Sequence, residues 1–273
     1  MSKKNSPLLE EDFLVRIVPG AIQNSKQAYK YYFFQIQNEL QTAFFLTASE
    51  LKAKIFGKSL GVLTLVIDPV LQAVIYYFLT AIVFKGVVGA SFLSLFMTVV
   101  LWQLFAKPLG NAPSAFGANA GILKQTNFSL RIVFFSFLSF ELFLWVINFV
   151  ILVLFLALNG VYPNLNWVYL PVFIFAQFVF TVALAFPMSI LGAYIKDLPT
   201  FLAPMIGIWF YLSPGIYDKS RIPLQYQWLY DLNPFVTFFE AYRAIFFKIG
   251  EVQFTGIGIV FILSVVFLIL EIK

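Results

Sequence analysis

The feature that most constrains this chain is a series of long apolar runs separated by short polar segments. Of the 273 residues, 61% are hydrophobic and 11% are charged, whereas an ordinary soluble domain carries about 25% charged residues. A soluble fold cannot hide this much apolar surface, and one or two membrane anchors cannot account for it. The sequence therefore predicts an all-α polytopic membrane protein, because runs of this length suit membrane-spanning helices.

Six transmembrane helices are expected. At 1.5 Å per residue, the first run is roughly 37 Å long, which is enough to cross a bilayer with some tilt. The predicted spans are residues 60–84, 91–112, 132–158, 167–191, 200–213 and 254–270.

Two segments precede the first span. Residues 1–41 are polar and weakly patterned, and they are expected to form a cytoplasmic tail. Residues 42–59 are basic and amphipathic, which is typical of a helix that lies in the membrane interface. An ordinary solvated helix is the alternative. Because this segment continues directly into an apolar run, the pattern favours an interface helix.

Residues 213–250 are unusual for a loop. Two proline-marked turns, Ser213-Pro214-Gly215 and Asn233-Pro234, divide half-apolar pieces at 222–232 and 235–247. Each piece is too short to span a membrane and too apolar for a free loop. Irregular backbone at membrane depth needs cover from protein or a water-filled cavity. The region is therefore predicted to hold re-entrant or interfacial helices on the outer side.

The distribution of basic residues predicts the orientation. Six spans place both termini on one side of the membrane. The flanking basic residues on that side are Lys52, Lys54, Lys58, Lys107, Lys124, Arg131, Lys196 and Lys273. Those on the other side are Lys85, Lys219, Arg221, Arg243 and Lys248, most of which come from one long loop with acidic neighbours. The positive-inside rule then places both termini in the cytoplasm and the protein in the cytoplasmic membrane.

Neither Cys nor His occurs in the chain. Their absence excludes disulfides, thiolate nucleophiles and histidine metal sites, and it removes the commonest general base near neutral pH. The chain is therefore expected to have no catalytic residue, no metal site and no cofactor of its own. The net charge of +5 fits the basic flanks of membrane spans better than it fits nucleic-acid binding.

Few residues suggest chemistry. Gly57-Lys58-Ser59 resembles the end of a phosphate-binding loop, but Lys52 stands where the full pattern needs a glycine. Two carboxylates inside predicted spans, Asp68 and Glu141, are candidates for function because ionisable residues are costly there. Structural and functional roles are both open for them. With Asp197 and Glu240 they lie on different segments, so a structural or pore-lining role is favoured.

Aromatic residues cluster at two places, Tyr76-Tyr77-Phe78 in the first span and Trp209-Phe210-Tyr211 at the end of the fifth. One interpretation is an interfacial belt with ordinary packing. The other is a stacking track for an amphipathic polymer, because sugar rings present C–H faces to aromatic rings.

Several stretches together resemble the type-2 ABC exporter permeases, in particular those that export O-antigen, teichoic acid and capsule-like polysaccharides. The stretches are Glu50 to Gly61 with Asp68-Pro69, Trp102 to Ala106, Gly121 to Ser129, Lys196 to Pro199, Tyr211 to Tyr217, Leu232 to Pro234, and Tyr242-Arg243. The resemblance covers about residues 42–270. Ser129 replaces a proline that is frequent in the family, and Asp68 replaces a neutral residue.

The resemblance implies a homodimer that pairs with two copies of a separate ATPase subunit, which binds ATP and Mg²⁺. It implies a lipid-linked polysaccharide as substrate, a cytoplasmic coupling segment at 117–131, and membrane lipid as surroundings. The residues expected to couple to the ATPase are Glu50, Lys52, Lys54, Lys58, Gly121, Lys124, Gln125, Arg131 and Asp197. Those expected to line the channel are Tyr76, Tyr77, Phe78, Trp209, Phe210 and Tyr211. Those expected to form an outer gate are Ser213, Pro214, Tyr217, Asn233, Pro234 and Arg243.

Three alternatives remain open at this point. A type-2 ABC exporter of a small lipid or drug shares the fold but does not need an aromatic channel. An integral-membrane enzyme acting on lipid-linked sugars would have to rely on carboxylates. A secondary transporter would work without an ATPase, but the chain shows no repeat of Gly/Pro-broken helices between its halves.

Overall fold

The computed structural model describes residues 41–52, 63–78, 91–118, 130–217 and 222–272. Every regular element in these ranges is helical. In chain order they are a helix at 41–52, α3 (Leu63–Tyr77), α4 (Phe92–Ala118), α6 (Leu130–Leu158), the 3₁₀ helix η2 (Leu165–Tyr169), α7 (Leu170–Tyr194), α8 (Leu198–Leu212), α9 (Leu224–Asp231), α10 (Pro234–Phe247) and α11 (Thr255–Ile272).

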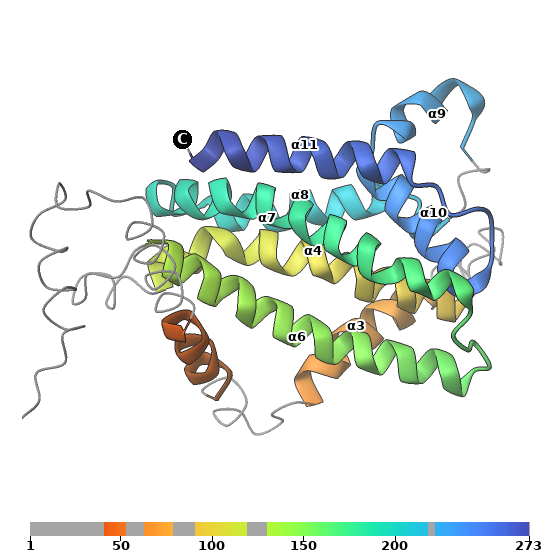
Figure 1. Ribbon diagram of the computed structural model, residues 1–273, viewed down its shortest axis with the longest axis horizontal. Helices are drawn as coiled ribbons and strands as arrows, with labels where there is room; N and C mark the ends of the chain where they lie inside the picture. Colours follow the sequence, from red (N-terminus) through yellow and green to blue (C-terminus); the bar gives the residue numbers. More distant parts are fainter. Residues whose placement is uncertain (1–40, 53–62, 79–90, 119–129, 218–221, 273) are drawn as a thin grey trace, which may run out of the picture.

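Helix α4 lies at the centre of the bundle and packs against α7, α6, α3 and α8. Figure 1 shows α4, α6, α7 and α11 running side by side along the long axis of the molecule. The helix at 41–52, the start of α6 and the end of α11 lie at one end, here called the tail end. Helices α9 and α10 lie at the opposite end, here called the loop end.

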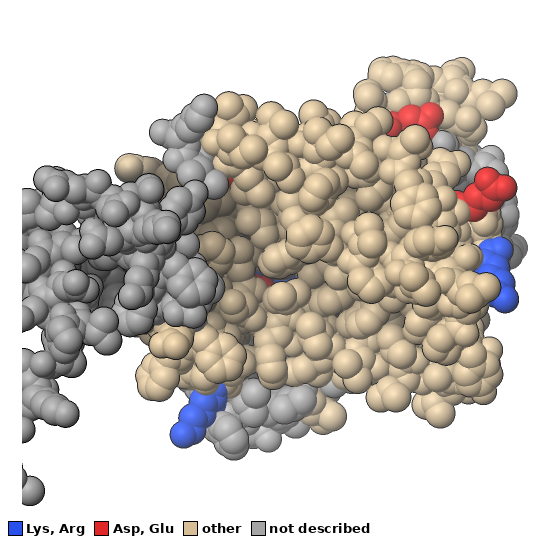
Figure 2. All heavy atoms as spheres, viewed as in Figure 1, with Lys and Arg blue, Asp and Glu red and all other residues tan. Residues whose placement is uncertain are grey.

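Three helical stretches are long and apolar enough to cross a membrane: Phe92–Gly117, Leu130–Leu158 and Leu165–Tyr194. Leu198–Leu212 and Thr255–Glu271 are shorter apolar helices. On the face shown in Figure 2, the charged atoms lie mainly toward the two ends, and the middle is almost entirely uncharged. The structure thus agrees with the predicted all-α polytopic membrane protein. Helix α3 lies inside the predicted span at 60–84, and the count of six spans remains a prediction.

Helix α4 continues to Ala118, beyond the expected span end at residue 112, although it contains Pro108 and Pro113. A proline removes one N–H donor from a helix, and membrane helices tolerate this when neighbouring groups compensate. Side chains from neighbouring helices reach the α4 backbone about one turn before the carbonyl oxygen of Leu104, which Pro108 leaves without its helical donor. Trp145 Nε1 donates to the Val100 carbonyl oxygen at 2.9 Å. These contacts fix α4 against its neighbours.

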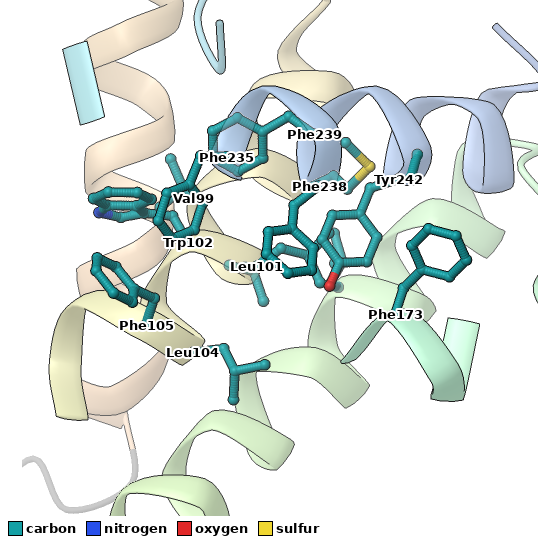
Figure 3. Packing of buried hydrophobic residues seen from close by; sticks show 14 of the residues in the cluster. Val99, Leu101, Trp102, Leu104, Phe105, Phe173, Phe235, Phe238, Phe239 and Tyr242 are labelled. Atoms are coloured by element: carbon teal, nitrogen blue, oxygen red, sulfur yellow. The ribbon is translucent and has the colours of Figure 1, made fainter. Parts of the chain in front are cut away.

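Helix α10 is buried, which explains why residues 235–247 are too apolar for a free loop. Its Phe235 ring centroid lies 4.4 Å from that of Trp102 and 4.6 Å from that of Phe105, both on α4 (Figure 3). Lipid tails are as apolar as this core, so close packing rather than water exclusion favours the contact. The two short helices α9 and α10 occupy the predicted outer region, and α10 is covered by protein.

One buried polar bridge ties α4, α7 and α10 together. Gln177 on α7 donates from Nε2 to the Leu101 carbonyl oxygen at 2.8 Å and accepts from the Tyr242 hydroxyl at 2.7 Å. Both side chains are fully buried. In Figure 3 the hydroxyl of Tyr242 points away from α10 toward the bundle. The bridge therefore holds the short outer helix in register with two long ones.

We expect Gln177→Leu to lower the free energy of unfolding by about 1–2 kcal/mol, because it leaves the buried Tyr242 hydroxyl without an acceptor. The double variant Gln177→Leu/Tyr242→Phe removes both partners and should lose less than the sum of the two single variants. Thermal unfolding of the detergent-purified proteins measures the three values. Additive losses would contradict a direct bond between the two side chains.

Candidate functional site

A cavity of about 340 Å³ opens between α3, α4 and α8. Both polar and aromatic side chains line it. The residues are Gln72, Tyr76, Val99, Trp102, Gln103, Ala106, Lys107, Gly110, Asn111, Ala203, Ile206, Gly207 and Phe210. We call it the polar cavity.

Polar side chains of α3 and α4 pair with each other at the polar cavity, which Gln72, Gln103 and Lys107 line. Lys107 Nζ on α4 lies 3.3 Å from Asp68 Oδ2 on α3, and Gln103 Nε2 donates to Gln72 Oε1 at 3.4 Å. Residues four apart on a helix lie on the same face, so each helix presents its two polar groups in one row. Asp68 pairs with Lys107, and Gln72 pairs with Gln103, so the residue numbers rise along α3 as they fall along α4. The two helices are therefore antiparallel.

These polar groups lie well inside the bundle rather than at its ends. Gln103 and Lys107 are eleven and fifteen residues beyond Phe92, the first residue of α4, or about 16 and 22 Å along a helix axis. The side chains of Lys107 and Asp68 are 46% and 62% exposed in this single chain. An exposed ion pair at this depth is costly in lipid. This face is therefore suited to contact with protein or a water-filled path.

Two further polar contacts lie behind the cavity. Asn148 Nδ2 on α6 donates to Gln103 Oε1 at 3.5 Å, and Asn111 Nδ2 donates to Glu141 Oε1 at 2.8 Å. Glu141 is buried between helices, whereas Asp68 is exposed and pairs with Lys107, which lines the cavity. The two intramembrane carboxylates of the sequence therefore have different surroundings. Glu141 joins α4 to α6, and Asp68 joins α3 to α4.

The expected channel aromatics divide between the cavity and other places. Tyr76 and Phe210 line the polar cavity, where their rings stack at a centroid distance of 5.1 Å. Tyr211 is exposed and meets Tyr76 edge to face at 6.0 Å. These three residues form one aromatic patch, although they come from α3 and α8.

The other three channel candidates lie elsewhere. Tyr77 meets Phe92 of α4 edge to face at 5.7 Å, and Phe78 is exposed. Trp209 packs against the core and donates from Nε1 to Asn233 Oδ1 at 3.1 Å. Successive residues of a helix point in different directions, so the three members of each triplet do not all face one cavity. Their role in a channel stays a prediction.

The residues expected to form an outer gate are brought together at the loop end. Arg243 on α10 donates from Nη2 to the carbonyl oxygens of Pro214, Gly215 (3.3 Å) and Tyr217 (3.2 Å). Arg243 is buried, so this one guanidinium fixes the chain reversal after α8.

Asn233 completes this cluster. It donates from Nδ2 to Ser213 Oγ at 2.9 Å and accepts from the Phe235 backbone N–H at 3.0 Å, where it caps α10 ahead of Pro234. The Tyr217 hydroxyl donates to that of Tyr230 on α9 at 2.9 Å, or accepts from it. The segments on either side of α9 are thus held by bonds between their own side chains and by the guanidinium of Arg243.

The residues expected to couple to an ATPase lie at the tail end where the structure describes them. Glu50 and Lys52 are on the helix at 41–52, Arg131 is exposed at the start of α6, and Asp197 is exposed just before α8. Five further candidates lie outside the described residues: Lys54, Lys58, Gly121, Lys124 and Gln125.

The helix at 41–52 packs on α6 through small residues. Ala43 and Thr47 are buried, and the Thr47 hydroxyl lies 2.8 Å from the Ala43 carbonyl oxygen and 3.1 Å from that of Ser136. Phe44 and Phe45 are exposed on the other side of the helix. A protein-facing stripe of small residues and a free aromatic edge suit a helix in the membrane interface.

Gln72, Gln103 and Asn111 are not among the site residues predicted from the sequence, in which Lys107 counts as a flanking basic residue. One signal was available. Asp68, Gln72 and Tyr76 recur at every fourth position in the first apolar run, and Gln103, Lys107 and Asn111 do so in the second. Polar residues at this spacing mark one face of each helix.

Comparison with known proteins gives a consistent result. The family described as ABC-2 type transporter matches residues 41–247. An O-antigen export system permease protein RfbA of Klebsiella pneumoniae is 28% identical over 222 residues, which cover 81% of this chain and 85% of that protein. A second RfbA from the same species is 28% identical over 80% of this chain and 84% of its own length. The RfbA of Myxococcus xanthus is 25% identical over 74% of this chain and 79% of its own.

Proposed function

The chain belongs to the ABC-2 type transporter family, and from this premise we propose that it is the permease subunit of an exporter for an O-antigen-type polysaccharide. The observation that carries the proposal is its similarity to O-antigen export permeases, which covers 81% of the chain for one relative and 74% for another. The protein is then a transport component, and the hydrolysis of ATP belongs to a separate subunit.

The ATPase partner is expected at the tail end. The helix at 41–52, Arg131 and Asp197 would lie against it, and the partner would bind ATP and Mg²⁺. Charged side chains at the ends of the bundle can contact a soluble subunit without entering lipid. Closure of the ATPase dimer on ATP would push on this end of the bundle, and the helices would pass the movement to the polar cavity.

We propose that a second copy of the chain packs against the exposed face of α3 and α8. Asp68, Gln72 and Lys107 are too polar for that face to meet lipid tails. Exposed apolar side chains flank them, namely Leu71, Val74, Ile75, Phe201, Met205 and Ile208. Two such faces turned toward each other would enclose a path that is polar inside and apolar at its edges. The functional complex would then contain two permeases and two ATPases.

The substrate is proposed to be lipid-linked, and the protein is proposed to lie in the cytoplasmic membrane with both termini in the cytoplasm. The basic residues at the tail end support this orientation. A glycan would enter near the helix at 41–52, pass between the two permeases and leave past the Arg243 cluster. Its aromatic contacts would come from Tyr76 and Tyr211, which share one patch.

The family and the relatives favour this function over the three alternatives. A secondary transporter or a membrane enzyme would not belong to an ABC transporter family. An ABC-2 exporter of a small lipid or drug has the same fold, but the curated relatives are polysaccharide exporters by name.

The proposal can be tested in the native host by deleting the gene for this chain and then restoring it. Without this gene, cells should still make the glycan but keep it inside, and surface glycan should fall to background. The wild-type chain together with its ATPase should restore surface glycan. An ATPase variant that binds ATP without hydrolysing it should not restore it. Normal surface glycan in the deletion strain would contradict the proposal.

A further inference from the structure

The polar cavity presents amide groups whose hydrogen-bonding capacity is only partly used. In the described part of the chain, Gln72 bonds to Gln103 alone, and Gln72 is exposed to the cavity. Gln103 is buried and has Asn148 behind it, whose Oδ1 is buried without a hydrogen-bond partner in that same part. A carboxamide offers two N–H donors and an acceptor oxygen. Gln72, whose Nε2 makes no hydrogen bond in the described part of the chain, can therefore donate to a ligand and accept from it through the remaining lone pair of Oε1.

Aromatic rings line the polar cavity as well, and Tyr76 lies on the same face of α3 as Gln72. Tyr76 is stacked on Phe210, and Phe210 in turn packs against Trp102 at a centroid distance of 5.3 Å. The three rings therefore pack as one group beside the amides. Amides next to aromatic faces suit a flat ligand with polar edges and apolar C–H faces. Sugar rings have this form.

The charges in the cavity favour an uncharged ligand. Lys107 is the only charged residue among the described residues that line the cavity, and it is paired with Asp68 at 3.3 Å. An anionic ligand would have to break that pair and leave the Asp68 carboxylate without its partner at membrane depth, which is costly. A hydroxyl-rich neutral ligand can bond to the amides and leave the ion pair intact.

We propose that the polar cavity is a binding subsite for uncharged, hydroxyl-rich sugar units of the transported glycan. The inference rests on the proposed function and adds which groups hold the chain inside the membrane. Its volume of about 340 Å³ is within the range of small-molecule sites. The subsite holds a short stretch of the glycan at a time, and the Asp68–Lys107 pair keeps it electrically neutral.

The absence of cysteine from the chain allows a direct test with one introduced thiol. Ala106→Cys places a thiol in the cavity wall, and Ala203→Cys places one on the opposite wall if the first variant does not assemble. Ile262→Cys, on the exposed apolar face of α11, is the matched control in lipid. The probe is a charged, water-borne methanethiosulfonate reagent applied to membranes from cells that make the glycan and from cells that do not.

The cavity thiol should react in membranes from cells without glycan and react several-fold more slowly when the glycan is made. The control thiol should react poorly in both. Gln72→Leu, introduced beside the cavity thiol, should weaken this protection and lower export by about three- to tenfold, the effect of one neutral hydrogen bond, without changing the amount of assembled complex. Equal reactivity with and without glycan, or no reactivity in either, would overturn the subsite.

A charge-neutral double variant separates a sugar subsite from an anion site. Asp68→Asn/Lys107→Gln keeps hydrogen-bonding groups at both positions but removes both charges. It should retain export if the ligand is uncharged. Loss of export in this variant, together with normal export in Gln72→Leu, would show that Lys107 binds an anionic group and would overturn the proposal. If wild type itself does not restore surface glycan to a deletion strain, the proposed function fails, which is a separate outcome.

Discussion

Gly192→Ala should prevent correct packing of the two helices that form the centre of the bundle. A Cβ atom at Gly192 of α7 would overlap the backbone of Pro113 on α4, including its carbonyl oxygen. The clash is with backbone, so no side-chain rotation relieves it. Overpacking of this kind costs about 1–3 kcal/mol, and occasionally more. Here the effect should lie at the upper end, because α4 contacts nearly every other long helix.

The measurement is the yield of monodisperse protein and the melting temperature in detergent, compared with Gly258→Ala. Gly258 on α11 has no atom within 4 Å of a built Cβ, so that substitution tests the glycine-to-alanine change without the clash. Gly192→Ala should reduce both yield and melting temperature, and Gly258→Ala should reduce neither. Equal behaviour of the two variants would show that α4 and α7 do not cross closely at this point.

Arg243→Met should release the turn that follows α8. The substitution keeps the length and much of the apolar stem but removes the donors to the carbonyl oxygens of Pro214, Gly215 and Tyr217. Hydrogen bonds to a charged group contribute about 1.5–3 kcal/mol each, and buried carbonyls without donors add to the loss. We expect the free energy of unfolding to fall by about 3 kcal/mol or more, and surface glycan to fall with it.

Arg243→Lys is the informative comparison. Lysine retains the charge, but its ammonium group lacks the planar fork that reaches several carbonyls at once. Its loss of stability should lie between those of wild type and Arg243→Met. Thermal unfolding and limited proteolysis of the segment at 213–232 measure both effects. If Arg243→Lys and Arg243→Met unfold like wild type, the guanidinium does not hold this turn.

Membrane helices were the most predictable part of this fold. The apolar runs predict α6, α7 and α11 to within a few residues, because few charges interrupt them. Proline does not mark the end of this membrane helix, since α4 passes through Pro108 and Pro113 and continues to Ala118. Proline normally ends helices in water, but in a membrane bundle neighbouring groups compensate for the missing donor.

The candidate site was only partly predictable. The resemblance identified Ser213, Pro214, Asn233 and Arg243 as members of one set. In the structure Asn233 donates to Ser213, and Arg243 donates to the carbonyl oxygen of the adjacent Pro214. All three members of each aromatic triplet are predicted to line the channel, yet Phe210 is buried whereas Tyr211 is exposed. Helical geometry alone predicts that neighbours diverge, so this split was available from the sequence.

The packing of one helix against another determines which polar faces meet, and this could not be predicted from the sequence. The four-residue spacing of Asp68 and Gln72, and of Gln103 and Lys107, marks one polar face on each helix. Nothing in the sequence says that these faces meet, or that Lys107 pairs with Asp68 rather than flanking the membrane. The close crossing at Gly192 likewise depends on how α7 lies across α4, which no local pattern records.

Transport by purified components tests the central claim most directly, that this chain forms the path while a partner hydrolyses ATP. The permease and its ATPase, reconstituted together in proteoliposomes, would be given the host's lipid-linked glycan on the ATPase side. The account predicts that glycan reaches the protected side only when both subunits and hydrolysable ATP are present. Glycan transfer by the permease alone, or unchanged transfer without ATP hydrolysis, would contradict it.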